Sequence, residues 1–158
     1  MIEEIKPYAV RAVVPADVSN LKAVIDSSEL FPSEMIEEMI APYFAQQEEC
    51  LWLTGDQDGP SFVAYCAPEK MTEGTWNLFL IAVHADRQGQ GIGRSVLAHI
   101  EAELQKRGVR QLLVDTSGLD EFKATRSFYY QCGYLQEAVI RDFYQQGEDK
   151  VTFVKRLN

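Results

Sequence analysis

The chain has 158 residues, enough for one folded domain with a hydrophobic core, and its 46% hydrophobic and 25% charged residues are ordinary for a globular protein in water. Its formal net charge of −9 argues against binding to nucleic acid, which normally requires a basic surface. No apolar run is long enough to cross a membrane, which argues against a membrane protein. The three cysteines have no disulfide spacing and no signal peptide is recognised, so the sequence favours the cytoplasm.

The beginning of the chain predicts one strand followed by two helices. Residues 8–14 alternate loosely between apolar and polar side chains, which favours a strand. Pro15 suits the first turn of a helix, and the apolar face of that helix leaves Asp17 on the side expected to face water. A second helix is expected to start near Pro32, and Pro42 should end or kink it because proline lacks a backbone N–H.

Three consecutive strands come next, and the pattern predicts an antiparallel meander over residues 50–54, 61–67 and 76–83. The Asp-Gly pair in Asp56-Gln57-Asp58-Gly59 favours a hairpin turn between the first two. The remaining chain predicts, in order, a helix, a strand, a helix and two strands over residues 95–107, 111–115, 124–132, 134–142 and 150–156. The crossover through the first of these helices should pair its flanking strands in parallel.

A glycine-rich stretch joins the strand at 76–83 to the following helix. Its residues are Gln88, Gly89, Gln90, Gly91, Ile92, Gly93, Arg94 and Ser95. Glycine allows positive φ and close approach of a ligand to the backbone, and the start of a helix offers unpaired N–H groups and partial positive charge. This stretch therefore predicts a binding site for a phosphate group. A turn that binds nothing is the simpler alternative.

The glycine spacing distinguishes between phosphate-binding motifs. Arg94 and Ser95 follow the last glycine, where a P-loop requires Lys and then Ser or Thr, and the dinucleotide fingerprint G-x-G-x-x-G is not matched. Gln88, Gly91 and Gly93 do fit Gln-x-x-Gly-x-Gly. This pattern resembles the pyrophosphate-binding signature of the GCN5-related N-acetyltransferases, the GNAT family.

A second match to the GNAT family lies in residues 125–134, which resemble the late helix of that family. Tyr129 falls at the position of its frequent catalytic tyrosine, and Gly133 and Tyr134 fall at its Gly-aromatic pair. The resemblance is strong over residues 78–134 and weak before residue 50. It implies a single domain over residues 1–158 with a mixed α/β (α+β) fold. A central, mostly antiparallel sheet of about seven strands would hold a splayed parallel pair in its middle, with about four flanking helices.

The resemblance also implies how acetyl-CoA would bind as co-substrate, without a metal. Its pyrophosphate would lie on the N–H groups of residues 88–94. Its pantetheine arm would follow the strand end formed by Ile81, Ala82 and Val83, whose N–H groups could stabilise the charge that develops on the thioester oxygen. Phe128 and Tyr129 would border the bound cofactor.

Two proton transfers need side chains. Tyr129 is the candidate general acid for the leaving thiolate, although it could simply pack on the cofactor. Some GNAT members use a glutamate as general base on the central strand, but here Asn77 occupies that position and cannot accept the proton. Asp115, at the end of its strand, is the tentative base, and a turn cap is an equal alternative for it. Asp142 and Glu34 are weaker candidates, and a water chain could replace a dedicated base.

The predicted activity is therefore an acyltransferase that moves the acetyl group of acetyl-CoA directly to a primary amine in a ternary complex. A non-catalytic acyl-CoA-binding or sensor domain of the same fold is the alternative, and a nucleotide-binding protein is a third. Residues 28–47 and the loop 142–149 would shape the acceptor pocket. The acceptor could be a small polyamine, an amino acid, an aminated antibiotic or a protein N-terminus, and a homodimer is compatible with the resemblance.

Overall fold

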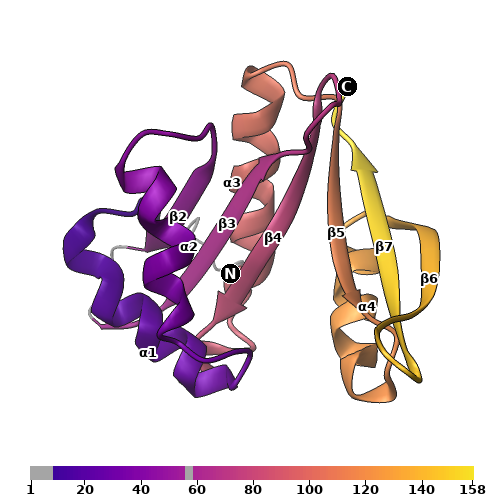
Figure 1. Ribbon diagram of the computed structural model, residues 1–158, viewed down its shortest axis with the longest axis horizontal. Helices are drawn as coiled ribbons and strands as arrows, with labels where there is room; N and C mark the ends of the chain where they lie inside the picture. Colours follow the sequence, from indigo (N-terminus) through magenta and orange to yellow (C-terminus); the bar gives the residue numbers. More distant parts are fainter. Residues whose placement is uncertain (1–8, 56–58) are drawn as a thin grey trace, which may run out of the picture. The chain divides into compact units, whose positions relative to one another are not determined.

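The structure is a computed structural model that describes residues 9–55 and 59–158 (Figure 1). Within these residues the strands are β1 (Val10–Ala12), β2 (Leu51–Gly55), β3 (Phe62–Pro68), β4 (Thr75–Val83), β5 (Gln111–Ser117), β6 (Leu135–Gln145) and β7 (Glu148–Arg156). The helices are α1 (Val18–Ser28), α2 (Met35–Phe44), α3 (Ile92–Lys106) and α4 (Lys123–Gln131). Three short 3₁₀ turns, η1 (Pro15–Asp17), η2 (Ala85–Arg87) and η3 (Asp120–Phe122), precede α1, α3 and α4.

The strands of the described residues form one sheet in the order β1-β2-β3-β4-β5-β7-β6. β4 and β5 pair in parallel from Thr75↔Gln111 to Leu78↔Val114. The pairs β1–β2, β2–β3, β5–β7 and β6–β7 are antiparallel. The crossover through α3 explains the parallel pair, because a strand that returns to the same sheet through a helix runs in the original direction. The predicted mixed sheet with a parallel pair and four helices is confirmed.

The described chain forms two compact units. Unit 1 contains the described part of Met1–Cys66 together with Leu80–Ile100, and unit 2 contains Ala67–Phe79 and Glu101–Asn158. Both β4 and α3 run from one unit into the other.

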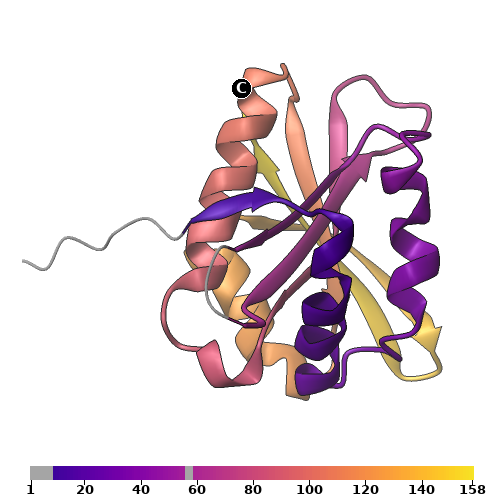
Figure 2. The ribbon, with the colours of Figure 1, turned by 90° about the vertical axis from the view of Figure 1, so that its left-hand side faces the viewer.

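In unit 1, helices α1 and α2 cover one face of the strands (Figure 2). Their apolar residues recur at helical spacing, which places one stripe of each helix against the sheet. The buried core consists of Val13, Leu21, Val24, Ile25, Ile36, Ile40, Trp52, Val63, Leu80 and Ala82. This core fixes the end of β4, from which the glycine-rich stretch departs.

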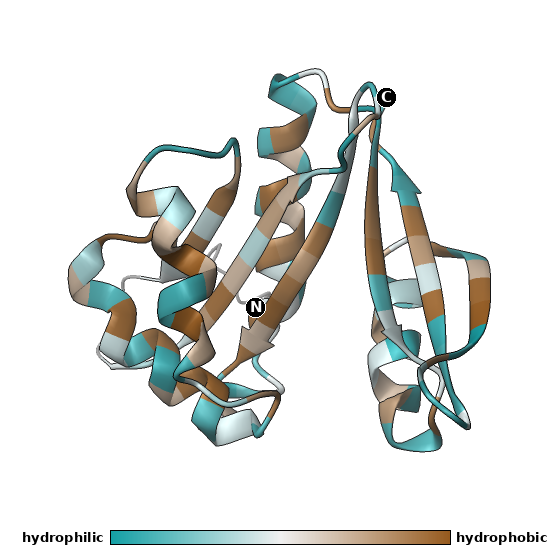
Figure 3. Ribbon diagram, in the orientation of Figure 1, coloured by the Kyte–Doolittle hydropathy of each residue, from teal (hydrophilic) through white to brown (hydrophobic). Residues whose placement is uncertain are grey.

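In unit 2, α4 packs against β7 through aromatic rings. The rings of Tyr129 and Phe153 lie 5.7 Å apart, and those of Tyr129 and Tyr134 lie 5.9 Å apart. Apolar residues run along β5 (Figure 3), and Leu112 and Val114 are buried. Lys155 on β7 completes this packing by donating a 2.8 Å hydrogen bond to Glu101.

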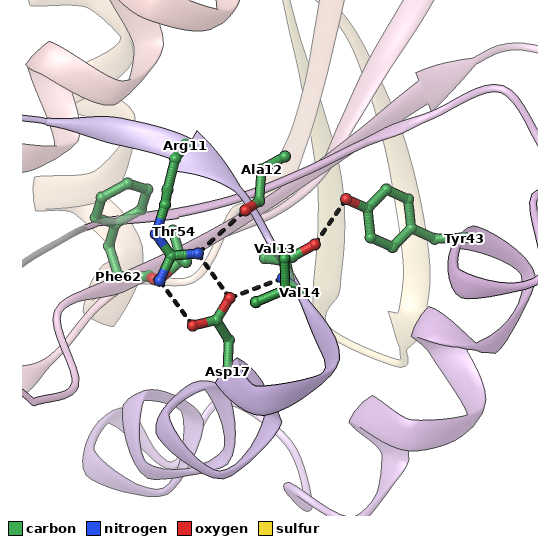
Figure 4. Close-up of polar contacts among 8 residues, drawn as sticks. All are labelled: Arg11, Ala12, Val13, Val14, Asp17, Tyr43, Thr54 and Phe62. Carbon is green, nitrogen blue, oxygen red and sulfur yellow. Dashed lines mark hydrogen bonds and ion pairs between the residues drawn. The ribbon is translucent and has the colours of Figure 1, made fainter.

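One expectation about the first helices is wrong. Asp17 does not face water, since only 8% of it is exposed and Arg11 binds its carboxylate with two hydrogen bonds of 2.7 Å (Figure 4). Pro42 lies inside α2, which continues to Phe44. The Tyr43 hydroxyl donates a 2.8 Å hydrogen bond to the carbonyl of Val13, so tertiary contact holds the helical turn that proline weakens.

Element boundaries also differ at two places. Helix α3 begins at Ile92, three residues before the predicted start, so Gly93 lies inside it. The predicted loop 142–149 is a tight turn, because β6 extends to Gln145 and β7 begins at Glu148. β3 follows β2 in antiparallel pairing as expected, but residues 56–58 of the predicted hairpin turn lie outside the described residues.

Candidate functional site

The glycine-rich stretch of unit 1 leaves β4 through η2 and enters α3. Gly89 and Gly91 have φ of 80° and 79°, a left-handed conformation that side chains rarely adopt. A Cβ placed on either glycine would meet no atom within 4 Å, so both face open space. Residues 88–91 are exposed, whereas Ile92 is buried and anchors the start of α3. The backbone of this stretch is therefore both accessible and held at its helical end.

The backbone N–H groups of residues 88–94 have no hydrogen-bond partner among the described residues. The first bond of α3 runs from the Ser95 N–H to the Gly91 carbonyl at 3.1 Å. The N–H groups before this bond point out of the helix end, where the helix dipole adds partial positive charge. Such an array of donors can bind phosphate oxygens, so the stretch fits the pyrophosphate predicted for it.

Hydrogen bonds among the described residues of unit 1 hold this stretch in place. The Ser27 hydroxyl, at the end of α1, accepts a 3.1 Å hydrogen bond from the Ala85 N–H. His84 donates its N–H to the Ser61 carbonyl at 2.7 Å, and its ring Nδ1 accepts a bond from the Asp86 N–H at 3.1 Å. The side chain of Gln88 then donates to the Val83 carbonyl at 3.2 Å. These bonds fix the donor array relative to the end of β4, where Ile81, Ala82 and Val83 lie.

Tyr129 lies in unit 2, on the face of α4 that packs against β7. It is 4% exposed, and its ring contacts Phe128, Tyr134 and Phe153. Within the described residues its hydroxyl has no hydrogen-bond partner. Burial raises the pKa of Tyr129 above its ordinary value, and the neighbouring Cys132 adds to this shift. The hydroxyl therefore stays protonated at neutral pH, as a general acid must be before it acts.

Asp115 lies on β5 in unit 2 and does not cap a turn. Its Oδ1 accepts a 2.6 Å hydrogen bond from the Thr152 hydroxyl on β7, and its Oδ2 accepts a 3.4 Å bond from the Asn77 amide on β4. Tyr144 on β6 belongs to the same surroundings, because burial and the carboxylates of Asp115 and Glu148 raise the pKa of its hydroxyl. Asp115 is half-buried and held on both oxygens.

Two residues of this group were missed by the sequence reasoning. Glu69 follows β3 and accepts a 2.8 Å hydrogen bond from the Asn77 amide, while Thr152 lies directly opposite Asp115. The β-strand alternation could have placed Thr152 on one face of its strand. Its register against Asp115, 37 positions away in the chain, is a tertiary property.

The other predicted candidates lie elsewhere. Asp142 binds the N–H of Gly147 at 2.9 Å in the β6–β7 turn, which is a structural contact. Glu34 precedes α2 and is exposed. Among the residues that the structure describes, no group of three or more His, Cys, Asp or Glu side chains could hold a metal ion. No helix in the same ranges is long and apolar enough to cross a membrane.

Comparison with protein-family models matches residues 47–136 to the acetyltransferase (GNAT) domain. This match covers more than half of the chain and includes both the glycine-rich stretch and Tyr129. The chain belongs to the GNAT family of acetyltransferases.

Known acetyltransferases are similar to this chain over different lengths. A structure from Desulfovibrio desulfuricans, of a protein assigned to the GNAT family, is 30% identical with a TM-score of 0.85, covering 95% of this chain and 99% of that one. The [Ribosomal protein bS18]-alanine N-acetyltransferase of Escherichia coli is 37% identical over 67 residues, which span 42% of this chain and 44% of that relative. The aminoglycoside 6'-N-acetyltransferase complexed with coenzyme A has 18% identity and a TM-score of 0.75, covering 94% of this chain and 97% of that one, and shares the fold.

The predicted site residues are divided between the two units. The glycine-rich stretch and the end of β4 belong to unit 1, while Asp115, Phe128 and Tyr129 belong to unit 2. The GNAT match ends at residue 136, so β7, which carries Thr152, lies beyond it.

Proposed function

We propose that the protein is an acetyl-CoA-dependent N-acetyltransferase that acts by direct attack of a primary amine in a ternary complex. The observation that carries this proposal is the run of N–H groups at residues 88–94, at the start of α3, that have no hydrogen-bond partner among the described residues. In a chain of the GNAT family, this array suits the pyrophosphate of acetyl-CoA.

Acetyl-CoA supplies an activated acetyl group as a thioester. Residues 88–94 and Ser95 would hold its pyrophosphate, and the open space beside Gly89 and Gly91 leaves room for phosphate oxygens. Ile81, Ala82 and Val83 would run beside the pantetheine arm, with Phe128 and Tyr129 also contacting the cofactor. Backbone N–H groups at the end of β4 would stabilise the negative charge that grows on the carbonyl oxygen.

Asp115 would act as the base and Tyr129 as the acid. Asp115 takes a proton from the ammonium form of the acceptor, which frees the nitrogen lone pair to attack the acetyl carbon. Tyr129 donates its hydroxyl proton to the sulfur as the carbon–sulfur bond breaks. The surplus proton of the new amide nitrogen returns to Tyr129, and Asp115 releases its proton to water.

The named relatives suggest two acceptor classes for this chain. One is an alanine of a ribosomal protein and the other is an aminoglycoside. The net charge of −9 suits either cationic acceptor. We also propose that the protein is cytoplasmic, because the relative's named substrate is a ribosomal protein.

The test is calorimetric titration of acetyl-CoA, with ATP and NADH as comparison ligands, into the wild type and Gly91→Glu. The matched control is Gly108→Glu, since Gly108 also has positive φ and open space beside it but lies after α3. We expect acetyl-CoA alone to bind, Gly91→Glu to lose binding and Gly108→Glu to retain it. Absence of acetyl-CoA binding, or equal loss in both variants, would overturn the proposal.

A non-catalytic acyl-CoA-binding domain is the second candidate, because Asn77 replaces the glutamate that some family members use as base. The two candidates predict different results when the protein is incubated with acetyl-CoA and a panel of primary amines. Free CoA thiol and an acetylated amine would be produced only by the enzyme.

A further inference from the structure

The side-chain amide of Asn77 lies between two carboxylates in unit 2. Its Nδ2 donates to Oε1 of Glu69 at 2.8 Å and to Oδ2 of Asp115 at 3.4 Å. Glu69 follows β3, Asn77 lies on β4 and Asp115 lies on β5, so three separate elements bring these groups together. One nitrogen thus occupies a position within hydrogen-bonding reach of two acidic side chains.

The two carboxylates lack a counter-charge. Both Glu69 and Asp115 are half-buried, and within the described ranges neither has a Lys, Arg or His side chain at ion-pair distance. Each carboxylate can accept several hydrogen bonds. Among the described residues, the side-chain donors to these carboxylates are the neutral groups of Asn77 and Thr152.

Asn77 supplies an independent second observation. It is 4% exposed, and its buried Oδ1 has no hydrogen-bond partner in the described part of the chain. The amide cannot simply be rotated by half a turn, because Oδ1 would then face the oxygens of Glu69 and Asp115. A buried acceptor without a donor is unfavourable, so an N–H group from a ligand would stabilise this oxygen.

We propose that Glu69 and Asn77 form the recognition site for the ammonium group of a cationic acceptor. A primary ammonium brings a positive charge for the carboxylates and three N–H donors, one of which can satisfy Oδ1 of Asn77. The assignment rests on the proposed function in one respect, namely that Asp115 then removes a proton from the bound ammonium. Glu69 thereby selects alkylammonium acceptors over uncharged amines.

The experiment follows the side-chain amide signals of Asn77 by ¹⁵N NMR, identified by their loss in Asn77→Asp. The protein is titrated with n-butylammonium chloride and, separately, with tetramethylammonium chloride, which has the same charge but no N–H. We expect saturable shifts of the Asn77 signals with butylammonium and none with tetramethylammonium. Equal shifts with both salts, or no shift with either, would overturn the proposal.

Two variants test the residue assignment. Glu69→Gln keeps the shape but removes the charge, and we expect butylammonium to bind roughly tenfold more weakly. Glu73→Gln is the matched control, because Glu73 is an exposed glutamate in the same loop, and it should bind like the wild type. Unchanged binding in Glu69→Gln, with an otherwise native spectrum, would exclude Glu69 from the site.

The same samples separate this inference from the proposed function. Acetyl-CoA is added at the end of each titration, and its binding is followed by the backbone signals of residues 88–94. Butylammonium binding without acetyl-CoA binding would refute the acetyltransferase and leave the ammonium site standing. Acetyl-CoA binding without shifts at Asn77 would refute the ammonium site alone.

Discussion

Asp115 and Thr152 lie directly opposite each other on β5 and β7, and the Thr152 hydroxyl donates a 2.6 Å hydrogen bond to Oδ1 of Asp115. This bond fixes the orientation of the carboxylate and leaves Oδ2 toward Asn77. The proposed base is therefore positioned by a residue that is 37 positions away in the chain.

Replacement of Thr152 should impair the proton transfer assigned to Asp115. Thr152→Val keeps the side-chain shape but removes the donor, and we expect kcat to fall roughly tenfold because a charge-assisted hydrogen bond is lost. Thr152→Ser retains the hydroxyl and should retain most activity. The measurement is steady-state kinetics with the best acceptor of the amine panel, with acetyl-CoA affinity as a check on the fold. An unchanged kcat in Thr152→Val would contradict this positioning role.

Tyr129→Phe should lower kcat roughly a hundredfold, the usual scale for loss of a general acid, with little change in acetyl-CoA affinity. Tyr130→Phe is the matched control, since Tyr130 is the exposed neighbour on α4. Because the pKa of Tyr129 is raised, its hydroxyl stays protonated above about pH 10, so its ionisation should not reduce the rate between about pH 7 and pH 9. Full activity in Tyr129→Phe would show that the tyrosine only packs in the site.

The hydroxyl of Ser27 should contribute to acetyl-CoA binding although it lies on α1. It accepts a bond from the Ala85 N–H and so holds the turn before the glycine-rich stretch. We expect Ser27→Ala to weaken acetyl-CoA binding by about threefold to tenfold, the scale of one neutral hydrogen bond. Ser28→Ala provides the comparison, because Ser28 bonds only to carbonyls of its own helix. Calorimetry that gives equal affinities for both variants would contradict this link.

The Arg11–Asp17 pair should make stability depend on pH (Figure 4). The hydrogen bonds from Arg11 lower the pKa of Asp17 below its unfolded value, more than burial raises it. Their contribution is therefore present above about pH 4 and is lost as the pH falls through the lower folded pKa.

Asp17→Asn should accordingly lower the free energy of unfolding by about 2 kcal/mol near neutral pH, and the difference from the wild type should shrink in acid. Urea unfolding of both proteins, near neutral pH and in acid, measures this difference in the free energy of unfolding. Asp26→Asn, an exposed change on the following helix α1, should shift stability by less than about 0.5 kcal/mol. A difference for Asp17→Asn that grows as the pH falls would contradict the assigned sign.

The sequence by itself determined the order of the elements and the glycine-rich stretch. Alternation, helical periodicity and the positive-φ preference of glycine are local properties, so β4, α3 and the turn between them could be predicted from nearby residues alone. The GNAT resemblance also rested on two such local motifs, around Gly91 and Tyr129, and the family match covers both.

Only the tertiary structure decided which side chains meet. Asp17 was expected to face water because its helix position is polar, but Arg11 on β1 binds it away from solvent. The turn of α2 after Pro42 is supported by the hydrogen bond between Tyr43 and Val13, which joins residues 30 positions apart. Local rules fail at such positions because a partner from another element changes the balance of hydrogen bonding and burial.

The group formed by Glu69, Asn77, Asp115 and Thr152 is the clearest case. These residues come from four segments, and no spacing in the chain brings them together. They meet because a parallel crossover places β5 beside β4 and an antiparallel pairing places β7 beside β5. Strand register over such separations depends on the packing of the sheet as a whole, so the chemistry of this group is a property of the fold.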